Sequence, residues 1–591
     1  MGSRSIEKHR WWKEAVVYQV YPSTFLDANG DGWGDVPGII SKVPYLKELG
    51  VDVVWVSPIY KSPQVDMGYD ISDYYDIDPK YGTMADVERL IAELKRHGMH
   101  LMMDIVANHT SDQHPWFLES KSATDNAKRN WYIWKKGKVD AEGNPEPPNN
   151  WCSILKDGNS GWTYDKATDE WYLSVFTPEQ PDLNWELPEV RQAVQEVMRF
   201  WLDKGASGFR LDVINMISKL QTFPDADVTR PHDKYQPGTK YFVNGPRLHE
   251  FLKELNRTVF SKYDTITVGE MPAVSDDDEI LKVVGSDREE LNMIFIFDLV
   301  DIDIDKTEYH RFNWRQYQPK EFFDIVKRWQ RVMIERDGWN TLFLENHDNP
   351  RSVSRYLSDS DEYRDKAAKL LALLQTTLSG TVYVYQGEEI GMKNAPLSWD
   401  PKEYKDVESI SFWEKINKLY PGDSQKLDEA RRLLQLKARD HARTPVQWDS
   451  SANAGFCKAG VEPWMRVNDD FRRVNVAAQM KPSSDGDLSV WQFWQRGLEN
   501  RKKHKGAFIY GNFIAVNPED DNVFAYTRTG SQDGTWLVVL NFSKEEQLWE
   551  VPPDFELEAW VAGNYTPNAP DKGRRGTIRL KPFEGLLGRC V

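Results

Sequence analysis

MADVERLIAELKRHGMHLMMDIV, residues 84–106, joins a helical pattern directly to a short apolar run. In residues 84–98, apolar side chains recur at spacings of three and four, and the pattern ends at a glycine, a common residue just after a helix. Residues 99–106 have the length and the apolar content of a buried strand. The stretch therefore predicts a helix followed by a strand of a parallel sheet.

The same alternation continues along most of the chain. Eight apolar runs are expected to be buried strands, and helical patterns lie between most of them. The expected strands are residues 16–20, 51–58, 99–106, 208–214, 265–270, 293–299, 340–348 and 381–389. The helical patterns are residues 84–98, 188–205, 321–338 and 363–380. This alternation predicts an α/β fold, a (β/α)8 TIM barrel, with functional residues at the C-terminal ends of the strands.

Two segments depart from the alternation. Residues 110–182 contain the Pro- and Asn-rich EGNPEPPNNW and lack a barrel-type helix, which predicts a subdomain inserted after strand three. From about residue 515, short strand-like runs separated by turn residues predict a C-terminal antiparallel β-sandwich. The expected domains are a barrel of residues 1–109 and 183–514, an inserted subdomain of residues 110–182, and a β-sandwich of residues 515–591. A long functional loop is expected at about residues 390–445.

The composition restricts the classes of partner. The net charge is −17 and the pI is near 5.3, so phosphate backbones and anionic membranes repel the chain, and neither nucleic acid nor a membrane is an expected partner. The 24 tryptophans have flat faces that suit sugar rings, although any single one is more often a core residue. Three widely spaced cysteines indicate no disulfide framework. The N-terminus lacks a signal-peptide core and no run reaches membrane-spanning length, which predicts a cytoplasmic protein.

Charged residues stand where a barrel enzyme needs them. Arg210 and Asp212 are two apart in an apolar strand, so their side chains point to the same face. Glu270 ends strand five, and His347 and Asp348 follow strand seven. Taken singly, the first two are also consistent with a structural ion pair, and the rest with helix caps or loop residues. Three acidic side chains at three strand ends favour a catalytic site.

Four segments, in order, resemble the signature segments of glycoside hydrolase family 13, the α-amylase superfamily. They are DIVANHT (104–110), GFRLDV (208–213), VGEMP (268–272) and ENHDNPR (345–351). Two more, QPDLNWE (180–186) and HARTPVQWD (441–449), resemble its oligo-1,6-glucosidase and α-glucosidase branch. The resemblance covers essentially the whole chain, and the ordered set is far more specific than any one motif.

The resemblance implies roles for three carboxylates. Asp212 would be the nucleophile that forms a glucosyl ester, and Glu270 would protonate the leaving oxygen and then activate water. The two would stand about 5–5.5 Å apart, as in retaining enzymes, and the pKa of Glu270 would be raised by burial and negative charge. Asp348 would be the third carboxylate, holding sugar hydroxyls in a distorted ring. No cofactor is expected for catalysis.

Further positions would bind the sugar. By resemblance, Arg210 would keep Asp212 ionised, and His109 and His347 would donate hydrogen bonds to glucosyl hydroxyls. Asp66, with Tyr69 beside it, would pair with Arg443 behind the terminal glucose and close the pocket, which admits only a chain end.

Two residues of the inserted segment, Phe176 and Gln180, would line the pocket, and ordinary packing is the alternative role for both. Val213 follows the nucleophile position, where valine in related enzymes accompanies acceptance of α-1,6 bonds. A side-chain difference of this size is worth about 1–3 kcal/mol, so it biases the linkage without fixing it.

DANGDGWGD, residues 27–35, resembles a calcium-binding loop. Its expected ligands are the side chains of Asp27, Asn29, Asp31 and Asp35 and the backbone carbonyl of Trp33. The position that carries a bidentate Glu in an EF-hand is Gly38, so the loop belongs to another fold. The oligo-1,6-glucosidase and α-glucosidase branch carries such a loop after its first strand. The resemblance therefore implies one structural Ca²⁺ or Mg²⁺ that is remote from the catalytic site. The alternative is a Gly-rich turn with solvated carboxylates.

The sequence thus predicts an exo-acting, retaining α-glucosidase that acts on short oligosaccharides and also transfers glucose to sugar acceptors. Isomaltose is an expected substrate, with maltose and sucrose left open, and nothing indicates the oligomeric state. A sucrose isomerase of the same family is the first alternative, but its RLDRD segment is DIDID (301–305) here. A non-catalytic transporter heavy chain is the second alternative, and it would need a transmembrane helix.

Overall fold

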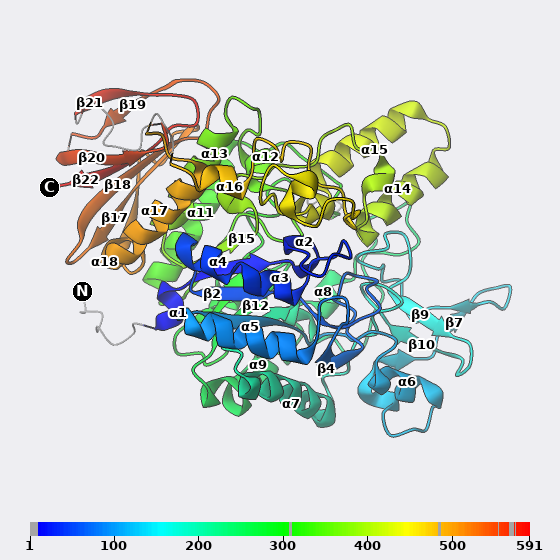
Figure 1. Ribbon diagram of the computed structural model, residues 1–591. Coiled ribbons are helices and arrows are strands. Elements are labelled where there is room, and N and C mark those ends of the chain that lie inside the picture. The colour runs from blue at the N-terminus through cyan, green and yellow to red at the C-terminus, as the bar shows by residue number, and fades with distance from the viewer. Residues whose placement is uncertain (1–9, 306–309, 483–485, 554, 566–572, 574) are drawn as a thin grey trace.

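The computed structural model describes residues 10–305, 310–482, 486–553, 555–565, 573 and 575–591 (Figure 1). Residues 1–9, which include most of the N-terminal segment used in the prediction about a signal peptide, lie outside the described residues. Within the described residues, no helix is both long and apolar enough to cross a membrane.

An eight-stranded parallel sheet forms the centre of the molecule. Its hydrogen-bonded order is β13-β12-β11-β5-β2-β1-β15-β14. The strands are β1 (Val16–Val20), β2 (Val53–Val56), β5 (His100–Val106), β11 (Gly208–Asp212), β12 (Ile266–Glu270), β13 (Met293–Phe295), β14 (Thr341–Leu342) and β15 (Thr381–Tyr385). At the two ends of this order, the Thr341 hydroxyl donates to the Ile294 carbonyl at 2.9 Å, so the first and last strands meet. The predicted (β/α)8 barrel is confirmed.

The side chains of each strand alternate between two hydrophobic layers. In β1, Val17 lies in the cluster that fills the barrel, with Trp55 and Met102, whereas Val16 and Tyr18 belong to the layer between strands and helices. In β11, Phe209 and Leu211 belong to that outer layer, which leaves Arg210 and Asp212 on the inner side.

The helices of the outer layer begin within two residues and end within three residues of the predicted bounds. They include α5 (Met84–Arg96), α7 (Pro188–Lys204), α11 (Pro319–Glu335) and α13 (Arg364–Thr377). Thr83 and Asp86 form a capping box at the start of α5. Gly205 follows α7 with a φ of 110°, a conformation that glycine adopts without steric cost.

Residues 110–182 form a small unit beyond one end of the barrel (Figure 1). It contains α6 (Pro115–Ser122), a β7–β8 hairpin (Lys138–Val139 and Pro145–Glu146), and a three-stranded antiparallel sheet in the order β6-β10-β9. The strands of that sheet are β6 (Trp134–Lys135), β9 (Trp162–Asp165) and β10 (Glu170–Leu173).

The C-terminal segment forms two antiparallel sheets at the opposite end of the molecule (Figure 1). The larger has the order β16-β17-β18-β22-β20 and the smaller pairs β19 with β21. Their strands are β16 (Asn512–Val516), β17 (Val523–Gly530), β18 (Gly534–Asn541), β19 (Gln547–Val551), β20 (Leu557–Gly563), β21 (Gly576–Leu580) and β22 (Gly585–Cys590). Trp549 and Trp560 share one buried cluster with residues of both sheets, so the predicted β-sandwich is confirmed.

Most predicted strands are longer than those in the structure, and three extend four or more residues too far. β13 ends at Phe295, β14 at Leu342 and β15 at Tyr385, whereas the predicted strands continue to residues 299, 348 and 389. After β15 the backbone turns at Gly387, whose φ is 90°, and Glu388 and Glu389 enter a short 3₁₀ helix. The carboxylate of Glu389 accepts hydrogen bonds from the hydroxyls of two buried tyrosines, which replaces strand pairing there.

The prediction of a loop for residues 390–445 is wrong for about half of that segment. It contains α14 (Val407–Leu419) and α15 (Ser424–Lys437), which lie together above one end of the barrel (Figure 1). The carboxylate of Asp406 caps the first helix and that of Asp423 caps the second. Both caps are visible in the sequence, but the helices bury few residues, so their apolar pattern is weak.

Candidate active site

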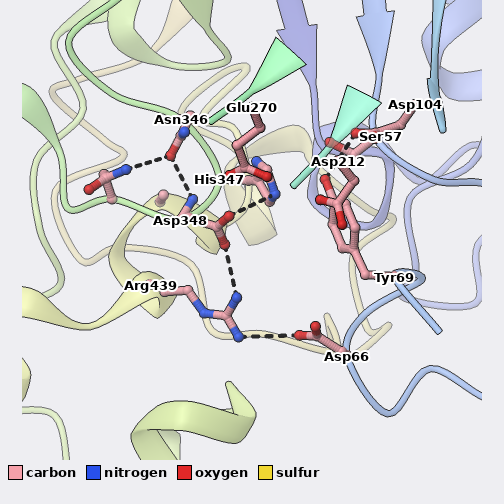
Figure 2. Close-up of polar contacts among 12 residues, drawn as sticks. Ser57, Asp66, Tyr69, Asp104, Asp212, Glu270, Asn346, His347, Asp348 and Arg439 are labelled. Carbon is pink, nitrogen blue, oxygen red and sulfur yellow. Dashed lines mark hydrogen bonds and ion pairs between the residues drawn. The ribbon is translucent and has the colours of Figure 1, made fainter. Parts of the chain in front are cut away.

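Two strand ends bring Asp212 and Glu270 to the same guanidinium group. Arg210 Nη1 lies 2.6 Å from Asp212 Oδ1, and Nη2 lies 2.6 Å from Glu270 Oε2. The same Nη1 donates to Asp104 Oδ1 at 2.9 Å. All four side chains are buried. Figure 2 shows Asp212 and Glu270 at the ends of adjacent strands, with Asp348 facing them.

Burial shifts the pKa values of both carboxyl groups upward. The pKa of Glu270 is raised to about 8 because burial, Asp212 and Asp348 outweigh the charge of Arg210. Burial also raises the pKa of Asp212, and Arg210 opposes this most strongly. Because the pKa of Asp212 is raised to about 7, below that of Glu270, Glu270 holds the proton in preference to Asp212, which is the order that a paired nucleophile and acid need.

The backbone after Asp212 is strained. Val213 has a φ of 35°, in the left-handed region that a β-branched residue rarely adopts. In this conformation the Val213 N–H donates to Glu270 Oε2 at 3.1 Å. The turn therefore links the position next to Asp212 directly to the second carboxylate.

The residues after β14 form a third side of the site. His347 Nδ1 accepts a hydrogen bond from the Gln19 amide at 2.8 Å, so its Nε2–H points to Asp348 Oδ2 at 3.1 Å. Burial lowers the pKa of His347 to about 3, so the ring is neutral. The Tyr69 ring stacks on it with centroids 5.2 Å apart.

Two arginines hold Asp348 in place. Arg439 Nη1 lies 3.0 Å and Arg443 Nη2 2.8 Å from Asp348 Oδ1. Although burial raises the pKa of Asp348, His347 and these arginines lower it well below its usual range, so the group stays ionised. Arg439 also reaches Asp66 Oδ1 at 3.2 Å and thus spans two acidic residues (Figure 2).

This differs from the pairing of Asp66 with Arg443 that the resemblance implies. In the structure, Asp66 pairs with Arg439, and Arg443 instead contacts Asp348 and Asp406 Oδ2, the latter at 2.8 Å. Sequence reasoning missed both Arg439 and Asp406. Arg439 lies two residues before the HARTPVQWD segment (441–449), so that segment pointed to Arg443 but not to Arg439.

The other predicted binding residues gather around the same space. His109 Nε2 lies 3.1 Å from the Tyr69 carbonyl, and the Tyr69 hydroxyl donates to Asp104 at 3.0 Å. Gln180 donates to Asp66 Oδ2 at 3.2 Å, and the Phe176 ring lies 5.0 Å from the His109 ring. These contacts place residues of the inserted segment against the ends of the barrel strands.

A cavity of about 220 Å³ opens above these groups. Eight predicted residues line it: Asp66, Tyr69, His109, Phe176, Asp212, Val213, Glu270 and Asp348. Gln180, Arg210, His347 and Arg443 lie behind the lining and contact it through the bonds above. The arrangement can hold a polar ligand between two buried carboxyl groups with raised pKa values and a third, ionised carboxylate.

The model of the alpha amylase catalytic domain matches residues 19–511 of the chain. The chain belongs to the alpha-amylase family. The α-glucosidase of Schizosaccharomyces pombe is 46% identical to this family member over 580 residues, which are 98% of each chain. The oligo-1,6-glucosidase of Parageobacillus thermoglucosidasius is 44% identical over 579 residues, again 98% of each. The protein is therefore a glycoside hydrolase.

A solved structure resembles this hydrolase along its whole length. A mutant of isomaltulose synthase from Erwinia rhapontici NX5, in complex with sucrose, superposes with a TM-score of 0.91. It is 38% identical in sequence, and the match covers 99% of this chain and 100% of that one. The relatives of this chain thus include glucosidases and an isomaltulose synthase.

In the loop of residues 27–35, the carboxylates of Asp27 and Asp35 accept hydrogen bonds from nearby backbone N–H groups. Asp27 accepts the N–H groups of Gly30 and Gly32 at 2.5 and 2.9 Å, and Asp35 accepts that of Gly38 at 2.7 Å while capping α3 (Val36–Ser41). Among the described residues, no group of three His, Cys, Asp or Glu side chains is placed to hold a metal. The oxygen donors have the chemistry for Ca²⁺, but as placed they do not form a ligand set.

Proposed function

We propose that this glycoside hydrolase is an exo-acting, retaining α-glucosidase that releases glucose from the non-reducing ends of short α-glucosides. The observation that carries the proposal is the single Arg210 guanidinium held between Asp212 and Glu270. Two carboxylate oxygens on neighbouring nitrogens of one guanidinium lie close together, as the retaining mechanism requires.

Asp212 attacks the anomeric carbon and forms an ester, while the bond to the leaving oxygen breaks. Glu270 gives its proton to that oxygen, so the aglycone leaves as a neutral alcohol. Glu270 then takes a proton from water, which attacks the same carbon and frees Asp212. Two inversions leave the released glucose in the α configuration.

Asp348, held ionised by two arginines, binds hydroxyls of the terminal glucose, with His347 and His109 as neutral neighbours. The Asp66–Arg439–Asp348 chain of ion pairs supports a closed inner end, which only a chain terminus can reach. A sugar hydroxyl in place of water gives glucosyl transfer, because the covalent intermediate accepts either. Val213 lines the cavity beside Asp212 and supports acceptance of α-1,6 bonds.

Sucrose isomerisation is the second candidate because the superposing solved structure is an isomaltulose synthase. Its characteristic segment corresponds here to residues 301–305, and Asp301 and Ile304 line the cavity. Without arginines in this segment, free fructose lacks the cationic contacts that the segment would supply to retain it for transfer. Free glucose and fructose from sucrose are therefore expected, whereas isomaltulose or trehalulose would support the isomerase.

The test of the proposed function is a panel of α-1,2, α-1,3, α-1,4 and α-1,6 glucobioses. Glucose release from isomaltose is expected, and NMR of the first product should show the α anomer. Initial release of β-glucose would contradict the retaining mechanism. Release of oligosaccharides instead of glucose from a longer chain would contradict exo action.

We also propose that the loop of residues 27–35 binds a divalent cation in solution, after its carboxylates rotate away from the backbone. The donor types of the loop support this: they are hard oxygens, the kind that Ca²⁺ prefers. At a hundredfold excess over its dissociation constant, a bound ion adds about 2.7 kcal/mol to the stability of the folded state.

EDTA is therefore expected to lower the melting temperature by a few degrees, and Ca²⁺ should restore it. Asp31 is an exposed residue of the loop, so Asp31→Asn removes one expected ligand without disturbing the core. In this variant the effect of EDTA on the melting temperature should largely disappear. Equal melting curves with EDTA and with Ca²⁺ for the unmodified protein would contradict cation binding and would mean that the loop is only a hydrogen-bonded turn.

A further inference from the structure

One carboxylate at the outer end of the cavity joins three parts of the chain. Lys415 Nζ lies 2.5 Å from Asp157 Oδ2, and Arg230 Nη1 lies 3.1 Å from Asp157 Oδ1. The ring of His310 stands 3.7 Å away. Asp157, Arg230 and His310 all line the cavity. None of these contacts takes part in the proposed chemistry.

The carboxylate and its two closest partners come from segments far apart in sequence. Asp157 lies in the inserted segment 110–182, Arg230 lies between β11 and α8 (Thr239–Phe242), and Lys415 lies on α14. Figure 1 shows α14 and the strands β7, β9 and β10 on opposite sides of the same end of the barrel. Asp157 therefore bridges two walls of the opening.

The bridge is partly buried and charged. The side chains of Asp157 and Arg230 are 14% and 9% exposed, so water screens this pair less than a surface pair. Although burial raises the pKa of Asp157, His310, Lys415 and Arg230 lower it below its usual value, so the group is ionised at neutral pH. Burial lowers the pKa of His310, so Lys415 and Arg230 are the permanent positive charges beside Asp157.

The local backbone fits the bridge. Gly158 has a φ of 84°, which turns the chain directly after Asp157. A Cβ atom at Gly158 would lie 3.8 Å from Lys415 Nζ, so the lysine packs over this turn. The same α14 places Glu408 in the cavity lining, so any movement of the helix at Lys415 also moves the wall of the cavity.

We propose that Asp157 is a specificity-determining residue: its bridge to Lys415 and Arg230 holds the outer walls together and limits how many sugar units the enzyme accepts. The inference rests on the proposed function, since it concerns the acceptor end of the same cavity. Hydrogen bonds such as that from Trp151 Nε1 to the Pro224 carbonyl, at 2.9 Å, already join the inserted segment to the segment of Arg230. The Asp157–Lys415 pair connects this wall to α14, so the width of the opening depends on that pair.

The test compares kcat/KM for isomaltotriose with kcat/KM for isomaltose in the same preparation, so the fraction of active enzyme cancels. In Asp157→Asn, which keeps the shape but removes the charge, this ratio is expected to rise about three- to tenfold. Lys415→Gln should raise it similarly, and the double variant should add little. Asp157→Glu should stay nearer the original ratio.

Salt provides a readout that a merely structural role would not move. Both sugars are neutral, so a rise of the ratio with salt in the unmodified enzyme, absent from both single variants, reports screening of the bridge. Asp227→Asn is the matched control, because Asp227 lies with Arg230 in the segment between β11 and α8 and pairs with the exposed Lys240 at 3.0 Å. That variant should keep the original ratio.

The results distinguish failure of the proposed function from failure of the inference about Asp157. If the unmodified enzyme releases no glucose from either sugar, the proposed function fails. If it does, and the ratio is unchanged or lower in both Asp157→Asn and Lys415→Gln, then the bridge does not limit substrate length and the inference is overturned. Circular dichroism of each variant identifies a variant that fails to fold, and the other variant then decides.

Discussion

Replacing Asp212 with Asn is expected to lower kcat by about 10⁴- to 10⁶-fold on every α-glucoside that the enzyme accepts. The amide keeps the shape of the carboxylate but cannot form the ester. It also leaves Arg210 without one of its three carboxylate partners, each within 3.0 Å. The substitution should change kcat more than KM, because Asp212 begins to bond to the anomeric carbon only in the transition state.

The measurement is the initial rate of glucose release under saturating substrate, with the fold checked by circular dichroism. Asp324→Asn on α11 is the control, because that carboxylate is 52% exposed and only pairs with surface lysines. Its kcat should be unchanged.

Stereochemistry makes the role of Asp212 specific. In Asp212→Ala, azide can enter the space that the carboxylate vacates and should yield β-glucosyl azide from an activated α-glucoside. Residual activity within tenfold of the unmodified enzyme, or an α-azide product from this variant, would assign the nucleophile elsewhere.

The barrel was predictable because its strands are buried on both faces. A parallel strand inside an α/β fold reads as a nearly continuous apolar run, and all eight runs became strands of one sheet. The ends of three strands were predicted too late in the chain; after Tyr385, for example, the residues QGEE form a turn and the start of a short 3₁₀ helix. Gly387 and the buried hydrogen bonds of Glu388 and Glu389 end the strand there, and these depend on distant residues.

The positions of the site were more predictable than its contacts. The spacing in GFRLD puts Arg210 and Asp212 on the inner face by strand geometry alone. The choice of Arg439 as the partner of Asp66 depends on how residues 390–445 fold over the barrel, which no local pattern fixes. The strained φ of Val213 is likewise invisible in a sequence that reads as a continuing strand.

Replacing Glu270 with Gln should have the second largest effect, and its size should depend on the leaving group. Isomaltose needs a proton on the departing oxygen, so kcat/KM for this sugar is expected to fall by about 10²- to 10⁴-fold. A dinitrophenyl α-glucoside departs without a proton, so its kcat/KM should fall by less than about tenfold. Its turnover should then be limited by breakdown of the ester, which lacks its base.

The pH profile links this result to the environment of Glu270. The acid role requires the proton, so kcat/KM of the unmodified enzyme for isomaltose should fall as pH rises through about 8, the pKa to which burial raises this group. In Glu270→Gln this basic limb should be absent for the dinitrophenyl substrate. Equal losses for both substrates, with the basic limb retained, would mean that Glu270 positions Arg210 rather than donating a proton. Exogenous azide separates the two steps further: it should speed turnover of the aryl glucoside in Glu270→Gln and give α-glucosyl azide, because Asp212 still forms the ester from the opposite face.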